Sequence, residues 1–224
     1  MRQGMRADFR KVDAISLKIR ERTVQSARIH VKTRMGTDLV ATFDPKIQWI
    51  KTSGIISPLY WGNLPGGEVF TAPARVDGIF VVDGSIGDYF GLRYGDIGQT
   101  PMTLEIADNM LISAECELPG LADEFVNYCR STENGDRVGE FAMGTNLNVF
   151  EITGNLLQDE KIPGVHIAFG NPYGSQTGAN WTAKTHIDVI SRESNIWTDG
   201  EQIMENGIFR ADRLGFDYME GMDI

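Results

Sequence analysis

The pattern of hydrophobic and polar positions along the chain predicts many short strands and few helices. Most apolar segments are four to eight residues long and rich in β-branched and aromatic residues, and several alternate with polar positions, which is the period of a strand. The predicted strands cover residues 28–33, 38–43, 47–50, 68–71, 76–82, 102–107, 110–115, 137–143, 166–169 and 186–190. Asp108-Asn109, Asp199-Gly200 and Asn206-Gly207 supply the turn residues of hairpins.

Helical spacing of apolar residues occurs in only a few places. After Asp8, which is suited to be an N-cap, this spacing predicts an amphipathic helix with one apolar face that ends at about Thr23. A second helix is expected after Pro119-Gly120, ending near Asn134-Gly135, and a helical turn at 155–161. Because the chain also contains 25 Gly and 8 Pro, the predicted fold class is α+β, with β-rich mixed sheets and a few short helices.

The length of 224 residues is enough to bury a substantial core, so we expect one main domain with appendages. Residues 1–24 would form an N-terminal helix, residues 25–210 the main domain and residues 211–224 an acidic tail. No internal repeat or low-complexity tract is present in the sequence.

Charge and composition narrow the possible partners. The net charge of −10 and the pI of about 4.8 argue against nucleic acid and anionic membranes as partners. The sequence has no apolar run near the ~18 residues of a membrane span, and its basic N-terminus leads into an amphipathic segment, so we expect no signal peptide. We therefore expect a cytoplasmic protein in which Cys116 and Cys129 are free thiols.

Candidate chemistry gathers in residues 164–188, which hold two of the three histidines. His166 opens one predicted strand and His186 the next. Because alternate side chains of a strand share a face, His186 and Asp188 point the same way, as two metal ligands on one rigid element would. The Gly- and Asn-rich connection between the strands contains Tyr173 and can line a pocket. A hydrogen-bonded histidine in the core or on the surface would give the same pattern.

Two glutamates stand in predicted strands. Glu68 follows the tight turn Pro65-Gly66-Gly67, whose glycines let backbone approach a bound group closely. Glu140 lies among apolar neighbours, where it must be paired, bound to a metal or turned to solvent, because burying a bare charge is very costly. Two exposed glutamates are the alternative. His30 has no acidic residue in its own segment, and we interpret it as structural.

The five residues Glu68, Glu140, His166, His186 and Asp188 supply three carboxylates and two imidazoles. Such a donor set suits two divalent cations. The three carboxylates and one bridging hydroxide would together cancel the four positive charges of the cations. The chain has no G-x-S-x-G, no Walker loop and no H-E-x-x-H. Residue types alone do not decide the function, because many proteins contain five such residues.

Four motifs occur in order along the chain: N-L-P-G-G-E-V-F-T-A-P around Glu68, V-G-E-F-A around Glu140, H-I-A-F-G-N-P-Y from His166, and T-H-I-D before Val189. Together they resemble the M29 family of metallo-aminopeptidases, the aminopeptidase T type, over about residues 25–210. T-D-L at 37–39 also fits.

The resemblance implies a hydrolase that removes N-terminal residues from peptides by a metal-activated hydroxide. Glu68, Glu140, His166, His186 and Asp188 would hold two divalent ions (zinc, cobalt or manganese). Glu68 or Glu140 would carry a proton, and Tyr173 would bind a metal or the tetrahedral intermediate. The implied partners are a peptide or small-molecule substrate and a second copy of the chain in a homodimer.

The sequence departs from the family pattern in three places. We expect the large N-terminal domain of family members to correspond here to the first helix at most. The connection from Tyr173 to His186 is shorter than the family pattern implies, and residues 74–77 are poorer in polar groups than that pattern implies. Two alternatives therefore stay open. The first is a ring-cleaving dioxygenase similar to dihydroxypyridine dioxygenase, with one Fe(II) held by His166, His186 and Asp188. The second is a metal-binding or structural remnant without turnover.

Overall fold

A computed structural model describes residues 3–58 and 62–217 and contains two antiparallel sheets. The larger sheet contains β1 (Arg28–Lys32), β2 (Asp38–Thr42), β5 (Arg75–Val82), β6 (Met102–Ala107), β7 (Met110–Glu115), β11 (Asn195–Thr198), β12 (Glu201–Glu205) and β13 (Ile208–Phe209). The smaller sheet contains β3 (Ile50–Thr52), β4 (Glu68–Thr71), β8 (Val138–Gly144), β9 (Gly164–Gly170) and β10 (His186–Ser191). The strand orders are β13-β12-β11-β1-β2-β5-β6-β7 and β10-β9-β8-β4-β3.

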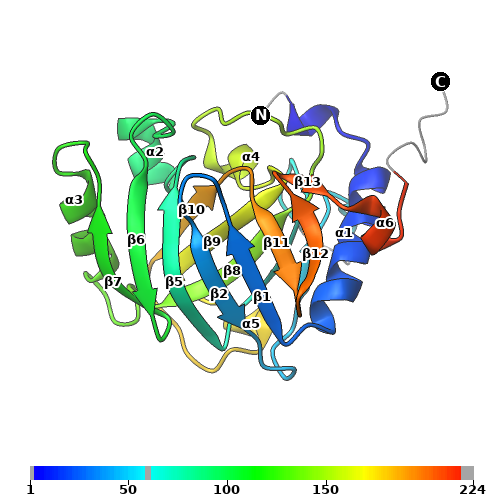
Figure 1. The fold of residues 1–224 in the computed structure, drawn as a ribbon, viewed down its shortest axis with the longest axis horizontal. Helices are drawn as coiled ribbons and strands as arrows, with labels where there is room; N and C mark the ends of the chain where they lie inside the picture. Colours follow the sequence, from blue (N-terminus) through cyan, green and yellow to red (C-terminus); the bar gives the residue numbers. More distant parts are fainter. Residues whose placement is uncertain (1–2, 59–61, 218–224) are drawn as a thin grey trace.

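All helices except α1 are short. The helical elements are the 3₁₀ turn η1 (Gly4–Arg6), α1 (Phe9–Val24), α2 (Asp88–Tyr94), α3 (Leu121–Cys129), α4 (Leu156–Asp159), α5 (Gly174–Thr177) and α6 (Ala211–Leu214). Figure 1 shows the larger sheet in front of the smaller one, with α1 along one side and α2 and α3 at the opposite end. The predicted strand-rich α+β class is confirmed.

The hydrophobic core lies between the two sheets. Phe80 of β5, Phe141 of β8 and Phe169 of β9 are fully buried members of a single apolar cluster that draws on both sheets. Phe125 of α3 packs edge-on against Phe169, with ring centroids 5.9 Å apart. The alternation of the strands thus places one face of each sheet in a shared core, as in other sandwiches.

Helix α1 begins as predicted and covers the β3–β4 edge of the smaller sheet. The Asp8 carboxylate accepts a hydrogen bond from the Arg10 N–H at 2.9 Å, which satisfies one of the unpaired donors of the first turn. Val12, Ile15 and Ile19 form its buried stripe. The helix thereby closes the side of the sheet next to Glu68.

Two sequence-based boundaries are wrong. The strand predicted at 47–50 begins only at Ile50, because a turn at Asp44 continues through Ile47. Helix α3 ends at Cys129 rather than near Asn134-Gly135. Helix α2 lies in the Gly-rich segment 83–98, for which no helix was predicted. The segment expected to form the acidic tail contains α6, whose Leu214 is buried, and residues 218–224 lie outside the described residues.

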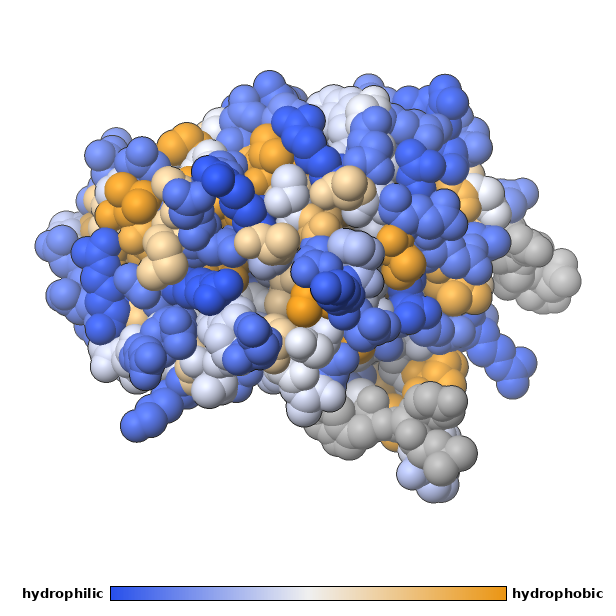
Figure 2. Space-filling model, turned by 90° about the horizontal axis from the view of Figure 1, so that it is seen from below, coloured by the Kyte–Doolittle hydropathy of each residue, from blue (hydrophilic) through white to orange (hydrophobic). Residues whose placement is uncertain are grey.

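Other expectations concern the surface and the thiols. Cys116 and Cys129 are free cysteines, as predicted. No helix within the described residues is long and apolar enough to cross a membrane. Viewed from below, hydrophilic residues cover most of the molecular surface, and hydrophobic residues are scattered between them in small groups (Figure 2).

Candidate metal centre

The five predicted ligands share one face of the smaller sheet. Glu68 is on β4, Glu140 on β8, His166 on β9, and His186 and Asp188 on β10. The residues that follow them along the strands are Val69, Phe141, Ile167, Ile187 and Val189, and all belong to the apolar core. Because neighbouring side chains of a strand point to opposite faces, the five polar residues lie on the face turned away from the larger sheet.

A β-bulge decides the face on which Glu140 lies. The pairing of β8 with β9 shifts register between Val138 and Glu140. Val138 and Phe141 both point into the core although they are three residues apart, so one extra residue is accommodated between them. The residue at the bulge is Gly139, where a Cβ would come within 2.1 Å of the Gly170 carbonyl oxygen. Bulges of this kind re-aim side chains beside functional sites.

Each candidate ligand faces a small residue on a neighbouring strand. Glu140 and Asp188 both pair with Ala168, which lies between them on β9. The remaining pairs are Glu68 with Gly144, His166 with Ala142 and His186 with Gly170. Small residues therefore stand opposite all five candidate ligands on a neighbouring strand.

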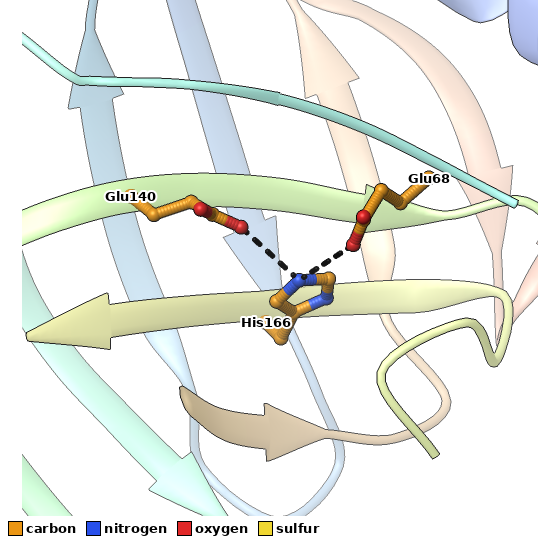
Figure 3. A group of neighbouring side chains, drawn as sticks. All are labelled: Glu68, Glu140 and His166. Carbon is orange, nitrogen blue, oxygen red and sulfur yellow. Dashed lines mark ion pairs between the residues drawn. The ribbon is translucent and has the colours of Figure 1, made fainter. Parts of the chain in front are cut away.

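Two carboxylates converge on one imidazole nitrogen (Figure 3). The carboxylates of Glu68 and Glu140 point toward His166 from two sides, and Glu68 Oε2 and Glu140 Oε1 are each 3.5 Å from His166 Nε2. All three residues are buried. We call Glu68, Glu140 and His166 the inner half of the centre.

A second group shares Glu140 with the first. His186 Nε2 is 3.8 Å from Glu140 Oε2 and 3.5 Å from Asp188 Oδ2. In each group the candidate ligand atoms lie within 4.8 Å of one another. We call Glu140, His186 and Asp188 the outer half, because the His186 side chain is 18% exposed. Glu140 therefore directs one oxygen to each half.

The donor atoms fit a metal. His166 Nε2 is buried and has no hydrogen-bond partner, although buried polar atoms are normally satisfied. His186 Nδ1 lies 2.9 Å from the Asn171 carbonyl oxygen, which can only accept a hydrogen bond, so Nδ1 carries a proton and Nε2 is directed to the centre. Metal-binding histidines are commonly oriented in this way by their second nitrogen.

The charges of the cluster perturb one another strongly. Burial lowers the pKa of a histidine, but the neighbouring carboxylates outweigh burial and raise the pKa of His166 and of His186 to about 10. Burial raises the pKa of Glu140. At Asp188 burial is outweighed by His186, and the pKa of this carboxyl is lowered.

These shifts predict that metal binding competes with protons. Below pH 10 both imidazoles are protonated in the metal-free protein, and each must lose its proton to bind a cation. We expect Zn²⁺ affinity to rise with pH between about 6.5 and 10, with about one proton released per imidazole at neutral pH. Calorimetric titration in buffers of different ionisation enthalpy measures the released protons. Affinity that stays constant across this range, without proton release, would contradict the prediction.

Sequence analysis missed Lys161 and Glu160, which lie between α4 and β9. The Lys161 ammonium is fully buried, 2.7 Å from Glu68 Oε1 and 2.5 Å from Glu160 Oε1. Burial acts to raise the pKa of Glu68, but Lys161 and then His166 outweigh it and hold that pKa well below its usual range. No periodicity in the sequence indicates this burial, because both residues lie outside the regular elements.

Tyr173 lies at the exposed edge of the centre. Its ring centroid is 4.6 Å from that of His186, and the residue is 38% exposed. The connection that carries it is anchored rather than loose, because the Thr177 carbonyl accepts a hydrogen bond from Gln48 and the Arg137 guanidinium stacks over Trp181 at 4.2 Å. Burial, followed by the charges of Glu140 and Asp188, raises the pKa of the Tyr173 hydroxyl.

The two remaining sequence-based expectations concern His30 and the glycines before Glu68. His30 Nε2 lies 2.6 Å from Asp38 Oδ1 of β2 in the larger sheet, outside the cluster. Its acidic partner comes from the neighbouring strand and not from its own segment. The close approach at Gly66 is to the protein itself, since a Cβ there would lie 2.0 Å from the Gly54 nitrogen.

A buried group of carboxylates and imidazoles on adjacent strands, with an unsatisfied imidazole nitrogen, is the kind of cluster found in metalloenzymes. Residues 14–209 match the thermophilic metalloprotease family M29. The chain belongs to this family. The predicted resemblance is thus confirmed at the level of the family.

Solved structures show the same fold. The 2,5-dihydroxypyridine dioxygenase of Pseudomonas putida is 17% identical, with a TM-score of 0.73 over 91% of this chain and 60% of that chain. Wild-type AmpT of Thermus thermophilus is 19% identical, with a TM-score of 0.68 over 93% of this chain and 56% of that one. The chain therefore spans less than two thirds of either protein. The comparison with curated protein sequences gave no match.

Proposed function

We propose that this chain is a metal-dependent aminopeptidase-like hydrolase that removes N-terminal residues from peptides. The observation that carries the proposal is the position of Glu140, whose two oxygens face His166 and His186 respectively. A carboxylate shared in this way suits two neighbouring cations better than one. Membership of family M29 supports the same reading.

The chain's residues would divide the chemistry among them. Glu68, Glu140 and His166 would hold one divalent cation, and Glu140, His186 and Asp188 the other, with zinc, cobalt or manganese as candidates. When bound, such a pair of cations polarises a carbonyl and lowers the pKa of water. Glu68 or Glu140 would accept a proton from the attacking water and return it to the leaving amine.

Tyr173 would act at the open side of the centre. Four of the five candidate ligands are buried, so a substrate reaches the cluster past His186 and Tyr173. Because the pKa of Tyr173 is raised, its hydroxyl keeps its proton and can donate a hydrogen bond to the negative charge that develops on the substrate carbonyl.

A comparison of free and blocked amines tests the proposal. The metal-loaded protein should hydrolyse alanine p-nitroanilide and should not hydrolyse N-acetylalanine p-nitroanilide, because an aminopeptidase binds the free α-amine. Both substrates release the same chromophore, so the acetyl group is the only variable. Equal hydrolysis of the two would indicate a hydrolase of another specificity, and failure to hydrolyse either would contradict the proposal.

A second candidate is a mononuclear Fe(II) ring-cleaving dioxygenase. It is favoured by the position of His166, His186 and Asp188, a two-histidine, one-carboxylate set on one face of the smaller sheet. The fold similarity to the Pseudomonas putida dioxygenase is consistent with it. Oxygen consumption with 2,5-dihydroxypyridine and Fe²⁺ would favour this candidate over the hydrolase.

The division into an N-terminal helix (1–24), a catalytic domain (25–210) and an acidic tail (211–224) is part of this proposal, as is a homodimer. The dimer is supported by the family resemblance alone. Sedimentation analysis of the purified chain would measure its oligomeric state directly.

A further inference from the structure

The buried ammonium of Lys161 lies against only one half of the metal centre. It contacts Glu68 Oε1, and Thr52 Oγ1 donates a hydrogen bond to the same oxygen at 2.8 Å. Glu68 Oε1 is therefore already satisfied by two donors. The other oxygen, Oε2, faces His166 Nε2 and is the one that Glu68 presents to the centre.

Among the residues that the structure describes, the outer half contains no comparable cation. Within residues 3–58 and 62–217, the ion pair of Asp188 is with His186, and those of Glu140 are with the two histidines. These imidazoles are themselves candidate ligands, and binding a cation would remove their protons. Lys161 differs from them because its positive charge stays when metal is bound.

We propose that Lys161 makes the two halves unequal, so that the inner half binds its cation more weakly than the outer half. This inference rests on the two-metal centre of the proposed function. A fixed positive charge close to a ligand oxygen repels a dication, and water screens that repulsion poorly in a buried site. Lys161 also holds Glu68 by one oxygen. It is a positioning residue, because it acts through Glu68.

The charge of Glu160 determines how strongly Lys161 repels a cation in the inner half. Its carboxylate lies 2.5 Å from the Lys161 ammonium, on a buried residue that is not itself among the candidate ligands. Burial raises the pKa of Glu160 to about 8, although Lys161 acts against it, so above that pH the Glu160 carboxylate is ionised and offsets part of the repulsion felt by a cation in the inner half. Replacing Glu160 alone should therefore lower the affinity of the inner half for a cation, whereas replacing Glu160 and Lys161 together should raise it.

Titration of the metal-free full chain with Co²⁺, against a competing chelator and at a pH above the raised pKa of Glu160 (about 8), tests the inequality. Visible absorption of Co²⁺ reports each binding step. We expect two steps whose Kd values differ by about tenfold or more, since each tenfold corresponds to only ~1.4 kcal/mol. Glu68→Gln should remove the weaker step and leave the tighter one. Asp188→Asn should remove the tighter step.

Three further variants assign the inequality to Lys161. Glu160→Gln should weaken the weaker step by about tenfold or more, because the Lys161 charge is no longer offset. The double variant Glu160→Gln/Lys161→Met should tighten that step, because it removes the cation together with the Glu160 carboxylate, while Glu68 keeps Thr52 and His166 as partners. Thr52→Val is the matched control: it removes a hydrogen bond to the same oxygen without a change in charge, and should leave the ratio of the two Kd values nearly unchanged.

The possible failures are distinguishable. Two cations bound with equal affinity would overturn the inference and leave the two-metal centre intact, whereas binding of no cation would overturn the proposed function as well. If Glu160→Gln leaves the weaker step unchanged or tightens it, Lys161 is not the cause. Melting curves of each variant show that it is folded, and Glu160→Gln alone decides the question if the double variant does not fold.

Discussion

Replacing His186 with Ala should lower the hydrolysis of alanine p-nitroanilide by about 100-fold or more. Removing a residue that merely orients a metal ligand typically costs about 10- to 100-fold in metal affinity or activity, so removing a ligand itself should cost at least as much. His186 Nε2 faces both Glu140 and Asp188. Its loss would leave the outer half with two carboxylates and no imidazole.

The matched control is His30→Ala. His30 pairs with Asp38 on the larger sheet and lies outside the cluster, and a partly exposed pair of this kind contributes about 0–1 kcal/mol to stability. The control should keep both its activity and its bound metal. kcat/KM and metal content are measured for both variants at one metal concentration. Equal rates for the wild type and His186→Ala would show that the measured hydrolysis does not arise at this centre.

Removing the metal should lower the melting temperature by about 10 °C or more. A ligand present at 100 times its Kd stabilises the folded state by ~2.7 kcal/mol per site, and 1 kcal/mol shifts the melting temperature of a domain of this size by about 2–4 °C. Three carboxylates converge on the centre, and their mutual repulsion rises when no cation is bound. Melting curves with and without EDTA measure the effect.

The size of this effect should depend on pH. The pKa values of His166 and His186 are raised in the metal-free protein, so the stabilisation from their protonated forms is complete below about pH 6.5 and is lost as pH rises toward about 10. The chelator should therefore destabilise the protein more at pH 9 than at pH 6.5. Asp188→Asn, which lacks one ligand, should respond less. A melting temperature that EDTA does not change would favour a protein without a metal.

Much of the fold could be predicted from local patterns. The Asp8 cap and the stripe of Val12, Ile15 and Ile19 predicted α1, because capping and helical period depend only on neighbours in the chain. The hairpin at Asp108-Asn109 was predicted for the same reason, and both residues have the positive φ that such a turn requires. The prediction of a strand at 47–50 was wrong, because a turn that begins at Asp44 occupies the first part of this apolar segment.

The residues of the candidate centre were predicted in part by strand period and in part by motif order. Strand period places His186 and Asp188 on one face, whatever the rest of the chain does. It would also place Val138 and Glu140 on one face. They lie on opposite faces, because the bulge at Gly139 shifts the alternation by one residue. Pairing between distant strands produces that bulge, and no local pattern specifies it.

By itself, the sequence determined the strand-rich class, the first helix and the set of polar residues that the strands carry. Only the tertiary structure decided that β4, β8, β9 and β10 bring those residues to one buried face, that Glu140 faces both histidines, and that Lys161 pairs with Glu68. The physical reason is the distance along the chain between the residues that interact. Caps, turns and periods depend on residues a few positions apart, whereas the charge that Glu68 experiences comes from Lys161, 93 positions away along the chain (161 − 68).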